Sequence, residues 1–239
     1  MGSINYLFPL TKRARLIIKI QSLLDEFSIL QQKADSFSSK RALSCIFELL
    51  QLIERIEIKM ELAKESEKFM INLFEEKTIE LKKYISQLIN SQGKIGENLR
   101  ANPSLQLLQK RLLLTGGSCE FDTPSLHSWL EGPLKLRMND LKIIYANFEL
   151  LHNTIISIVK NYYDYTELSK KTLSDGIIQL NPKPQSSIIL IKISDHDYQL
   201  YPEVSLSLKA VFVKIWSQQS LLEKNTPYDG QLELEIGEF

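Results

Sequence analysis

Apolar residues recur every three or four positions through most of the first 160 residues, which is the spacing of one face of an α-helix. The first such pattern predicts a helix over residues 12–30. Its apolar stripe consists of Leu16, Ile20, Leu23, Phe27 and Leu30. Lys12, Arg15 and Lys19 follow a similar spacing beside the stripe, so the predicted helix has one basic flank.

A second and longer pattern lies between residues 40 and 92, where the sequence contains neither glycine nor proline. Asp35 and the serines that follow it are N-cap candidates for this helix. The stripe alternates by four and three through Ala42, Ile46, Leu49, Ile53, Ile56, Met60 and Ala63. We expect one long helix, or a helix that breaks near residues 69–76 and restarts. Sustained heptads favour helix-on-helix packing, within the chain or across a dimer.

Shorter helices follow, over residues 105–114 and 124–131. Thr123 and Pro124 are residue types favoured at the N-cap and the first position of the second of these helices. Pro133 then opens the last long helix. Its apolar stripe consists of Leu141, Ile144, Phe148, Leu151, Ile155, Ile158 and Tyr162.

After about residue 165 the apolar period changes to two, which is typical of half-buried β-strands. The clearest alternating sets are Ile189, Ile191 and Ile193, and then Leu232, Leu234 and Ile236. Within residues 204–215 the apolar residues change from even to odd positions near Ala210. We interpret this stretch as one strand, with either both faces covered or a β-bulge at the change of phase. A bulge would place Lys209, Lys214 and Trp216 on the solvent face.

Together these patterns predict an α+β protein. We expect a mainly helical domain over residues 1–164, which provides dimerisation and part of a partner site. A small antiparallel β domain follows over residues 165–239. A short β-prone segment at residues 4–8 ends at Pro9 and precedes the first helix. We expect this N-terminal strand to be able to join the sheet of the β domain.

Composition and charge disfavour several classes of protein. The 239 residues include 29 Lys and Arg and 29 Asp and Glu, so the formal net charge is zero. Proteins that hold nucleic acid through its phosphates usually have a positive excess, which disfavours that class. Two cysteines cannot form a disulfide framework, and no apolar run reaches the roughly 18 residues of a membrane span. Because the first residues also lack a signal-peptide pattern, we expect a cytoplasmic protein without nucleic-acid or membrane partners.

Residue types suited to catalysis are present, but the motifs that usually surround them are absent. Cys119, Asp122 and His127 could supply the nucleophile, acid and base of a cysteine hydrolase, although no cysteine-protease signature surrounds Cys119. Residues 115–118 lack the lysine of a phosphate-binding P-loop. Residues 195–197, Asp-His-Asp, are more typical of a polar turn than of a metal site. We therefore expect no enzyme activity, metal or cofactor, and a hydrolase built on Cys119 and His127 stays open as an alternative.

Two basic pairs have the helical spacing of four residues, Arg15 with Lys19 and Arg55 with Lys59. Such pairs are often only the solvated face of a helix, but they are also candidates for binding. The predicted basic and aromatic face within residues 209–216 combines positive charge with an aromatic ring. That combination binds single-stranded nucleic acid, so a binder of this kind is the second alternative.

Residues 111–130, RLLLTGGSCEFDTPSLHSWL, resemble the central signature of the ZapD family of bacterial cell-division proteins, approximately QRL..PGG.C.FDLP.LH.WL. Three other stretches, residues 6–16, 48–55 and 199–205, resemble the family segments LFEHPLNEKMR, SELLDVFER and QLYPQIS. All four matches occur in the family's order and together extend over the whole chain. The first of the three is two residues shorter here, and the family's PGG is Thr-Gly-Gly at residues 115–117.

This resemblance implies a function. ZapD proteins are non-enzymatic cytoplasmic homodimers in which a helical domain is joined to a β domain. They bind the C-terminal tail of the tubulin-like division protein FtsZ, cross-link its protofilaments and so support the Z-ring at midcell. Positively charged and polar surface residues mediate that interaction.

Position by position, the resemblance implies partner contacts at Lys19, Arg55, His127 and Lys214. We expect Arg15 and Lys59 to support them. A basic position of the family falls on Pro103 here, so a contact there must be missing or shifted. Because one tail has to reach its contacts, we also expect Lys19, Arg55 and Lys214 to lie on one continuous surface.

Overall fold

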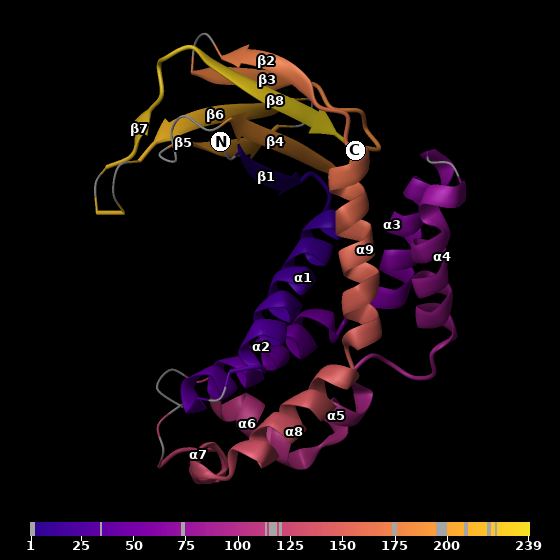
Figure 1. Ribbon diagram of the computed structural model, residues 1–239, viewed down its shortest axis with the longest axis vertical. Coiled ribbons are helices and arrows are strands. Elements are labelled where there is room, and N and C mark those ends of the chain that lie inside the picture. The colour runs from indigo at the N-terminus through magenta and orange to yellow at the C-terminus, as the bar shows by residue number, and fades with distance from the viewer. Residues whose placement is uncertain are drawn as a thin grey trace. The chain divides into compact units, whose positions relative to one another are not determined.

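The computed structural model describes residues 3–33, 35–72, 75–112, 114, 119, 121–173, 176–194, 200–207, 210–218, 221–222 and 224–239, with side chains not described at residues 72 and 75–77 (Figure 1). The chain divides into two compact units. One, here called the β unit, contains Met1–Leu16 and Val159–Phe239; the other, the helical unit, contains Ile17–Ile158. The two boundaries fall within helices α1 and α9.

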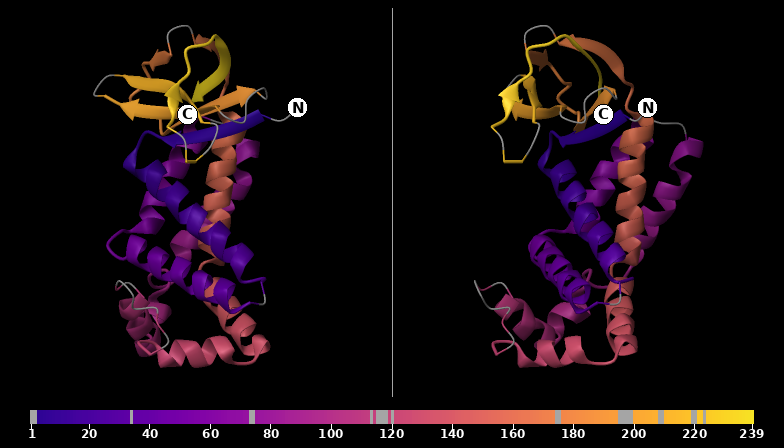
Figure 2. Two further views of the ribbon diagram at one scale, coloured as in Figure 1. Left: turned by 90° about the vertical axis from the view of Figure 1, so that its left-hand side faces the viewer. Right: turned by 60° about the vertical axis from the view of Figure 1, so that its left-hand side comes forward.

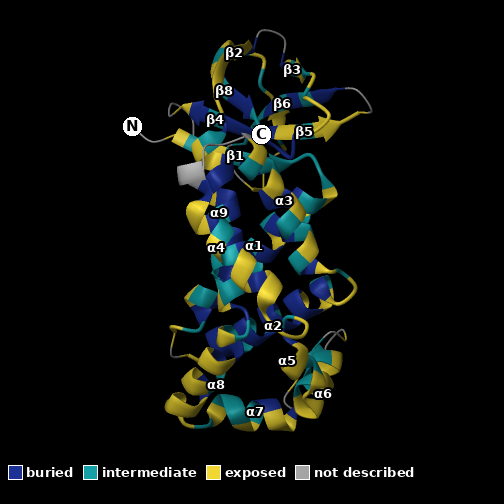
Figure 3. Ribbon diagram, turned by 90° about the vertical axis from the view of Figure 1, so that its right-hand side faces the viewer, coloured by how far each residue is buried: buried dark blue, intermediate teal, exposed yellow. Residues whose placement is uncertain are grey.

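The helices of the described chain are α1 (Lys12–Leu30), α2 (Ser36–Ile53), α3 (Ile58–Asn72), α4 (Glu75–Asn90), α5 (Glu97–Ala101), α6 (Pro103–Leu112), α7 (Pro124–Glu131), α8 (Leu134–Ala146) and α9 (Glu149–Tyr165). Within the helical unit α2 contacts α6, α7 and α8, and α3 packs against α4 as a helical hairpin. Figure 2 shows α7 and α8 following one another along one end of this unit. None of the described residues of α6 is buried, as its yellow (exposed) and teal (intermediate) colouring in Figure 3 shows.

The predicted helix over residues 12–30 is confirmed as α1. Its fully buried residues in the helical unit are Ile17, Ile20, Leu24 and Phe27. Leu16 and Leu23, which the stripe places in the core, are only half-buried. The buried face of α1 is therefore rotated by about one residue from the predicted stripe, and Leu23 lies at the edge of the core.

The uninterrupted heptad pattern over residues 42–63 is wrong as a prediction of one helix, because the chain breaks between α2 and α3. Ile56 N–H donates to the Ile53 carbonyl at 3.3 Å, and α3 begins at Ile58. After the break Ile58 and Leu62 are buried, whereas Met60 is 51% exposed. The predicted break near residues 69–76 is confirmed, since α3 ends at Asn72 and α4 begins at Glu75.

Of the two predicted N-caps, the one at Asp35 is confirmed and the one at Thr123 is not. The Asp35 carboxylate accepts a hydrogen bond from Ser38 N–H at 2.7 Å and caps α2. Asn102 Oδ1 accepts from the backbone N–H of Ser104 at 3.0 Å and so caps α6. Pro124 is the first residue of α7 as predicted, but the Thr123 hydroxyl donates to the Cys119 carbonyl at 3.1 Å instead of capping the helix.

The last long helix is interrupted at Asn147 and Phe148, which separate α8 from α9. Its predicted apolar stripe is nevertheless buried along its whole length. The stripe stays buried on both sides of the interruption because the interruption is only a tight turn, in which Phe148 N–H donates to the Tyr145 carbonyl at 2.8 Å. Gly96, with φ of +66°, comes close to this turn, and a Cβ added there would lie 3.0 Å from Phe148 Cζ and 2.8 Å from Leu50 Cδ2.

The described residues of the β unit form two antiparallel sheets. The first has the order β1-β4-β8-β2 and the second β3-β6-β5, with β7 paired to β6. Their bounds are β1 (Ser3–Pro9), β2 (Ser169–Leu173), β3 (Ile177–Leu180), β4 (Ile188–Ser194), β5 (Leu200–Leu206), β6 (Val211–Ser217), β7 (Thr226–Pro227) and β8 (Leu232–Glu238). One buried cluster contains residues from both sheets, for example Ile191 and Val213. The N-terminal strand joins the sheet as expected, because β1 pairs with β4 in a register that places Tyr6 opposite Ile191.

The stretch over residues 204–216 is two strands and not one bulged strand. β5 and β6 form a hairpin, in which Ser207 N–H donates to the Ala210 carbonyl at 2.9 Å. The apolar residues change phase because the chain reverses between the strands. Lys209 lies outside the described residues.

The loop between α4 and α5 is held by Lys59, near the start of α3. Its Nζ donates to the carbonyl oxygens of Ser91 at 2.6 Å and Gly93 at 3.0 Å. The unpaired carbonyls at the end of a helix favour a positive charge, so Lys59 closes the C-terminal end of the α3–α4 hairpin.

We predict that Gly96→Ala lowers the free energy of unfolding by about 1–3 kcal/mol more than Gly93→Ala, measured by urea denaturation. Both glycines have positive φ, so both substitutions strain the backbone similarly. At Gly93 the new Cβ meets only the flexible Glu97 side chain, whereas at Gly96 it meets packed Leu50 and Phe148. Equal losses in the two variants would contradict this account of the packing.

We also predict that Lys59→Met lowers the free energy of unfolding by about 1–2 kcal/mol, because two charge-assisted hydrogen bonds to carbonyls of the loop after α4 are lost. Lys64→Met is the matched control. Lys64 lies on the same helix and makes an exposed ion pair with Glu61 at 3.7 Å, and its loss should cost less than about 0.5 kcal/mol. If Lys59→Met were as stable as the control, the proposed closure would be wrong.

Candidate partner-binding groove

A surface groove in the helical unit brings two of the predicted contact residues together. It has a volume of about 860 Å³ and lies between α1 and the end of α2. Its lining residues are Lys19, Ser22, Leu23, Glu48, Gln51, Leu52, Glu54, Arg55 and Ile56. We call this feature the α1–α2 groove.

Helical periodicity explains how the sequence forms this groove. Lys19 and Leu23 are one turn apart on α1, and Glu48 and Leu52 are one turn apart on α2. Leu23, Leu52 and Ile56 are half-buried, so the groove has an apolar part that stays accessible. The adjacent core residues, such as Leu24 and Ile53, are buried and fix the rotation of both helices.

The break after α2 determines how Arg55 is presented. The helix ends at Ile53, and Arg55 lies exposed in the turn that leads to α3. Because the helix is interrupted there, Arg55 and Lys59 do not share a helix face despite their spacing of four residues. Arg55 lines the α1–α2 groove, whereas Lys59 binds carbonyls of the loop after α4.

The charges in the groove differ in how they are paired. Within the part of the chain that the structure describes, neither Lys19 nor Arg55 has an ion-pair partner, and both are exposed. Glu48, which also lines the groove, accepts a hydrogen bond from Arg41 Nη1 at 3.0 Å. The two basic side chains therefore remain available to a ligand while one acidic side chain is already engaged.

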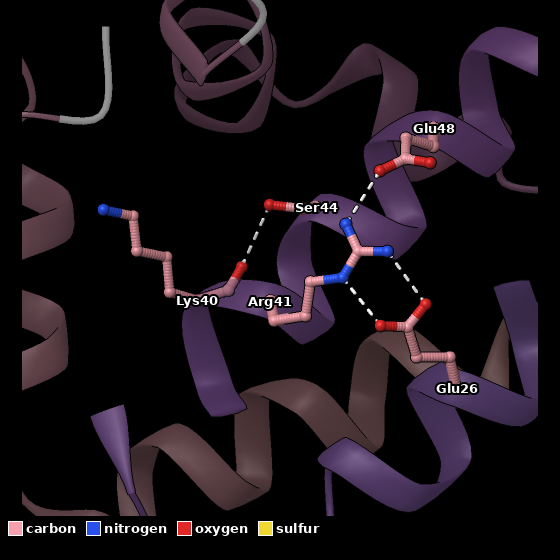
Figure 4. Close-up of polar contacts among 5 residues, drawn as sticks. All are labelled: Glu26, Lys40, Arg41, Ser44 and Glu48. Atoms are coloured by element: carbon pink, nitrogen blue, oxygen red, sulfur yellow. Dashed lines mark hydrogen bonds and ion pairs between the residues drawn. The ribbon is translucent and has the colours of Figure 1, made fainter. Parts of the chain in front are cut away.

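Arg41 forms a network that links α2 with α1 (Figure 4). Its Nε and Nη2 donate to the two carboxylate oxygens of Glu26 at 2.7 and 2.8 Å, and its Nη1 reaches Glu48. The hydrogen bond from Arg41 lowers the pKa of Glu26, and the same bond raises the pKa of Arg41. Burial raises the pKa of the nearby Cys45 thiol to about 12. The contact between Arg41 and Glu26 thus favours the charged form of both groups.

Lys214 belongs to the β unit and lies on the outer face of β6. The inward residues Val211, Val213 and Ile215 are buried, so the alternation directs Lys214 outward. Its Nζ lies 4.0 Å from the centre of the Trp216 ring, a cation–π contact. Trp216 Nε1 donates in turn to Glu203 on β5, at 2.5 Å. Lys214 is therefore presented beside a fixed aromatic ring. The sequence pattern placed these two residues together through a β-bulge, whereas the structure places them on a separate strand of the β5–β6 hairpin.

His127 is half-buried on α7 and lines a separate small pocket of about 190 Å³. Side chains of α2 complete this pocket, among them Phe37 and Lys40, together with Glu131 one turn after His127. It shares no lining residue with the α1–α2 groove. Arg15 is exposed on the part of α1 that belongs to the β unit.

The residues considered for catalysis or metal binding have other contacts. Asp122 makes an ion pair with Arg111 at 3.8 Å, and Cys119 is exposed. The described His, Cys, Asp and Glu residues form no cluster of three that could hold a metal ion. Residues 115–118 and 195–197 lie outside the described residues. Among the helices that the structure describes, none has the length and apolar character needed to cross a membrane.

His152 is a buried polar residue whose role the sequence did not reveal. Its Nε2 lies 2.8 Å from Asp25 Oδ1, and its Nδ1 lies 2.7 Å from the Tyr145 hydroxyl. Phe27 stacks on the Tyr145 ring with centroids 5.7 Å apart. These contacts connect α1, α8 and α9 within the core. They give His152 a packing role, which no local spacing could have indicated because its partners are distant in sequence.

Comparison with known proteins identifies the family. The sequence profile of ZapD, described as a cell division protein, matches residues 18–214. The cell division protein ZapD of Nitrosomonas eutropha is 24% identical over 95% of this chain and 97% of its own length. The ZapD of Dechloromonas aromatica is 27% identical over 84% of this chain and 85% of its own. That of Chromobacterium violaceum is 31% identical over 58% of this chain and 60% of its own.

The profile matches far more than half of the chain, and the matched region includes the helices and strands that present Lys19, Arg55, His127 and Lys214. The resemblance in the sequence motifs is thereby confirmed. The chain belongs to the ZapD family of cell division proteins, and its role is in bacterial cell division.

Proposed function

We propose that this protein is a non-enzymatic division factor that binds the C-terminal tail of FtsZ and, as a homodimer, cross-links FtsZ protofilaments. It would act in the cytoplasm and support Z-ring assembly at midcell. The observation that supports the proposal most directly is the meeting of Lys19 and Arg55 in the α1–α2 groove. These residues are 36 positions apart in the sequence, yet they line one accessible, partly apolar surface without an ion-pair partner in the described chain.

The groove has the chemistry that a disordered, partly acidic peptide needs. Apolar side chains of the peptide would cover Leu23, Leu52 and Ile56, and its carboxylates would approach Lys19 and Arg55. Ordering a disordered segment costs conformational entropy, so each single contact of this kind is weak.

The β unit supplies a second proposed contact, Lys214 beside Trp216. We assign His127 to the partner surface on the strength of the family motif around it. We assign Arg15 a supporting role, in which its positive charge attracts the same acidic partner. Lys59 would support the partner contacts only indirectly, because its ammonium group donates hydrogen bonds to carbonyls of the loop after α4.

Cross-linking follows from symmetry. A twofold dimer carries two copies of each tail-binding site, and each copy can hold a tail from a different filament. The second binding event is then intramolecular, so modest changes in single-site affinity become large changes in bundling. We assign the dimer contact to the helical part of the chain, residues 1–164, as the heptad patterns suggest.

We predict that Arg55→Glu and Lys214→Glu weaken binding of an FtsZ tail peptide by more than the several-fold loss expected of Ala substitutions. An exposed charge contact is worth at most about 1 kcal/mol, and charge reversal adds repulsion. Calorimetry with the peptide and sedimentation of FtsZ filaments, at low and moderate salt, measure the two effects. Bundling should fail more sharply than peptide binding because two sites act together.

The controls reverse an exposed lysine of the same unit. Lys64→Glu on α3 is matched to Arg55→Glu, and Lys170→Glu on β2 is matched to Lys214→Glu, because both lysines are exposed and lie outside the α1–α2 groove. If the Arg55 and Lys214 variants fold and then bundle filaments as well as these controls do, the basic contacts are not where the tail binds.

We predict that sedimentation equilibrium at micromolar concentration gives a mass of twice the 27.6 kDa chain. The stripes of α2 and of α8 with α9 are buried within the chain, but α3 and α4 leave large apolar side chains exposed, which favours a second copy as their cover. The exposed fractions of Met60, Ile71 and Ile79 on α3 and α4 are 51%, 82% and 63%. A single-chain mass at these concentrations would remove the basis for cross-linking by a dimer.

A further inference from the structure

Glu48 poses an electrostatic problem for the α1–α2 groove. The groove is lined by two basic residues, Lys19 and Arg55, and by two acidic residues, Glu48 and Glu54. With all four charges free, the lining would have no net charge; pairing of Glu48 with a residue outside the groove leaves the lining with one positive charge in excess, although Glu54 remains. Opposite charges on neighbouring turns would also pair with one another.

Arg41 changes this balance from outside the groove. It does not line the groove, but its Nη1 donates to Glu48 Oε1 at 3.0 Å. Glu48 is seven residues after Arg41, which places both on the same face of α2, two turns apart. One oxygen of the Glu48 carboxylate is therefore directed along the helix toward Arg41, although Glu48 still lines the groove.

Glu26 fixes the orientation of the Arg41 guanidinium group. The bidentate contact through Nε and Nη2 holds the plane of the guanidinium group, and Nη1 is left for Glu48 (Figure 4). Glu26 is seven residues after Lys19 on α1, so the network continues the same α1 face that forms one wall of the groove. The three side chains are 39%, 39% and 46% exposed, so the network lies at the surface and can influence a ligand there.

We infer that Arg41 is a positioning residue of the α1–α2 groove, which neutralises Glu48 and so leaves Lys19 and Arg55 available to an acidic peptide. The inference rests on the proposed function of the groove and adds a residue that is absent from the family motif. Without Arg41, the Glu48 carboxylate turns toward Lys19 or Arg55 and competes with the carboxylates of the ligand. A lysine at position 41 cannot replace the arginine fully, because one ammonium group lacks the fork that contacts both glutamates.

The test is a set of variants measured by calorimetry with a synthetic FtsZ C-terminal tail peptide at low salt. Arg41→Gln should weaken binding about three- to tenfold, and Arg41→Lys by less. Arg41→Gln combined with Glu48→Gln should restore binding to within about twofold of the parent. Arg41→Gln combined with Glu26→Gln has the same net charge but leaves Glu48 unmasked, so it should stay weak. Circular dichroism and the unfolding midpoint check that each variant is folded.

The two double variants separate a local effect from a general one. Equal rescue by Glu26→Gln and Glu48→Gln would show that only net charge matters, and parent-like binding by Arg41→Gln would show that Glu48 needs no neutralisation. Either result overturns the inference. Arg55→Glu distinguishes these failures from failure of the proposed function, because parent-like binding by that variant means that the groove does not hold the tail.

A second measurement does not depend on FtsZ. A crystal structure of Arg41→Gln, or of Arg41→Lys if the first variant does not fold, should show the Glu48 carboxylate within 4 Å of Lys19 Nζ or of the Arg55 guanidinium group. If Glu48 keeps its direction toward position 41, the positioning role is wrong even where the binding data leave the groove itself intact.

Discussion

Burial of one face of α2 is the constraint on which the rest of the helical unit depends. Ten of its 18 residues are buried, and α6, α7 and α8 all contact it. Each fully buried Leu or Ile contributes about 1.5–3 kcal/mol, so the rotation of this helix about its axis is strongly fixed. The remaining face carries Arg41 and Glu48, which consequently have to project toward α1 and the solvent. Core packing of α2 therefore also determines where the charged network and one wall of the groove lie.

The ion pairs of this face orient side chains more than they stabilise the fold. Exposed pairs contribute at most about 1 kcal/mol each, which is small beside the burial of α2. Their geometry is nevertheless specific. Nε and Nη2 of the planar Arg41 guanidinium group donate to the two oxygens of Glu26, so Nη1 is left to donate to another acceptor. A partly exposed network of this kind therefore determines which charged side chains of the surface already have a partner and which remain available to a ligand.

The sequence predicted local elements well and long-range assembly poorly. Residues 12–30 and 124–131 are α1 and α7, because their ends carry strong signals such as Pro124 and Gly132. The break at residues 54–57 has no glycine or proline, and packing on either side of it decides where the helix ends. β2 has only one buried residue, Leu173, so it carries no alternating pattern by which it could have been found. The motif resemblance implied contacts at Lys19 and Arg55, but the apolar and acidic lining between these residues depends on how α1 faces α2.

The neutrality of the whole chain is compatible with recognition of an acidic tail because pairing distributes the charges unevenly. Several lysines are engaged at the surface, including Lys64 with Glu61, Lys170 with Glu233 and Lys192 with Glu235. Such pairs contribute to the count of basic residues without attracting a ligand. In the α1–α2 groove the pairing works in the opposite direction, since Arg41 pairs with Glu48 from outside the groove and leaves Lys19, Arg55 and Glu54 in its lining. Net charge is therefore a poor guide to this class of partner, and the decisive quantity is which charged groups lack a partner on the same surface.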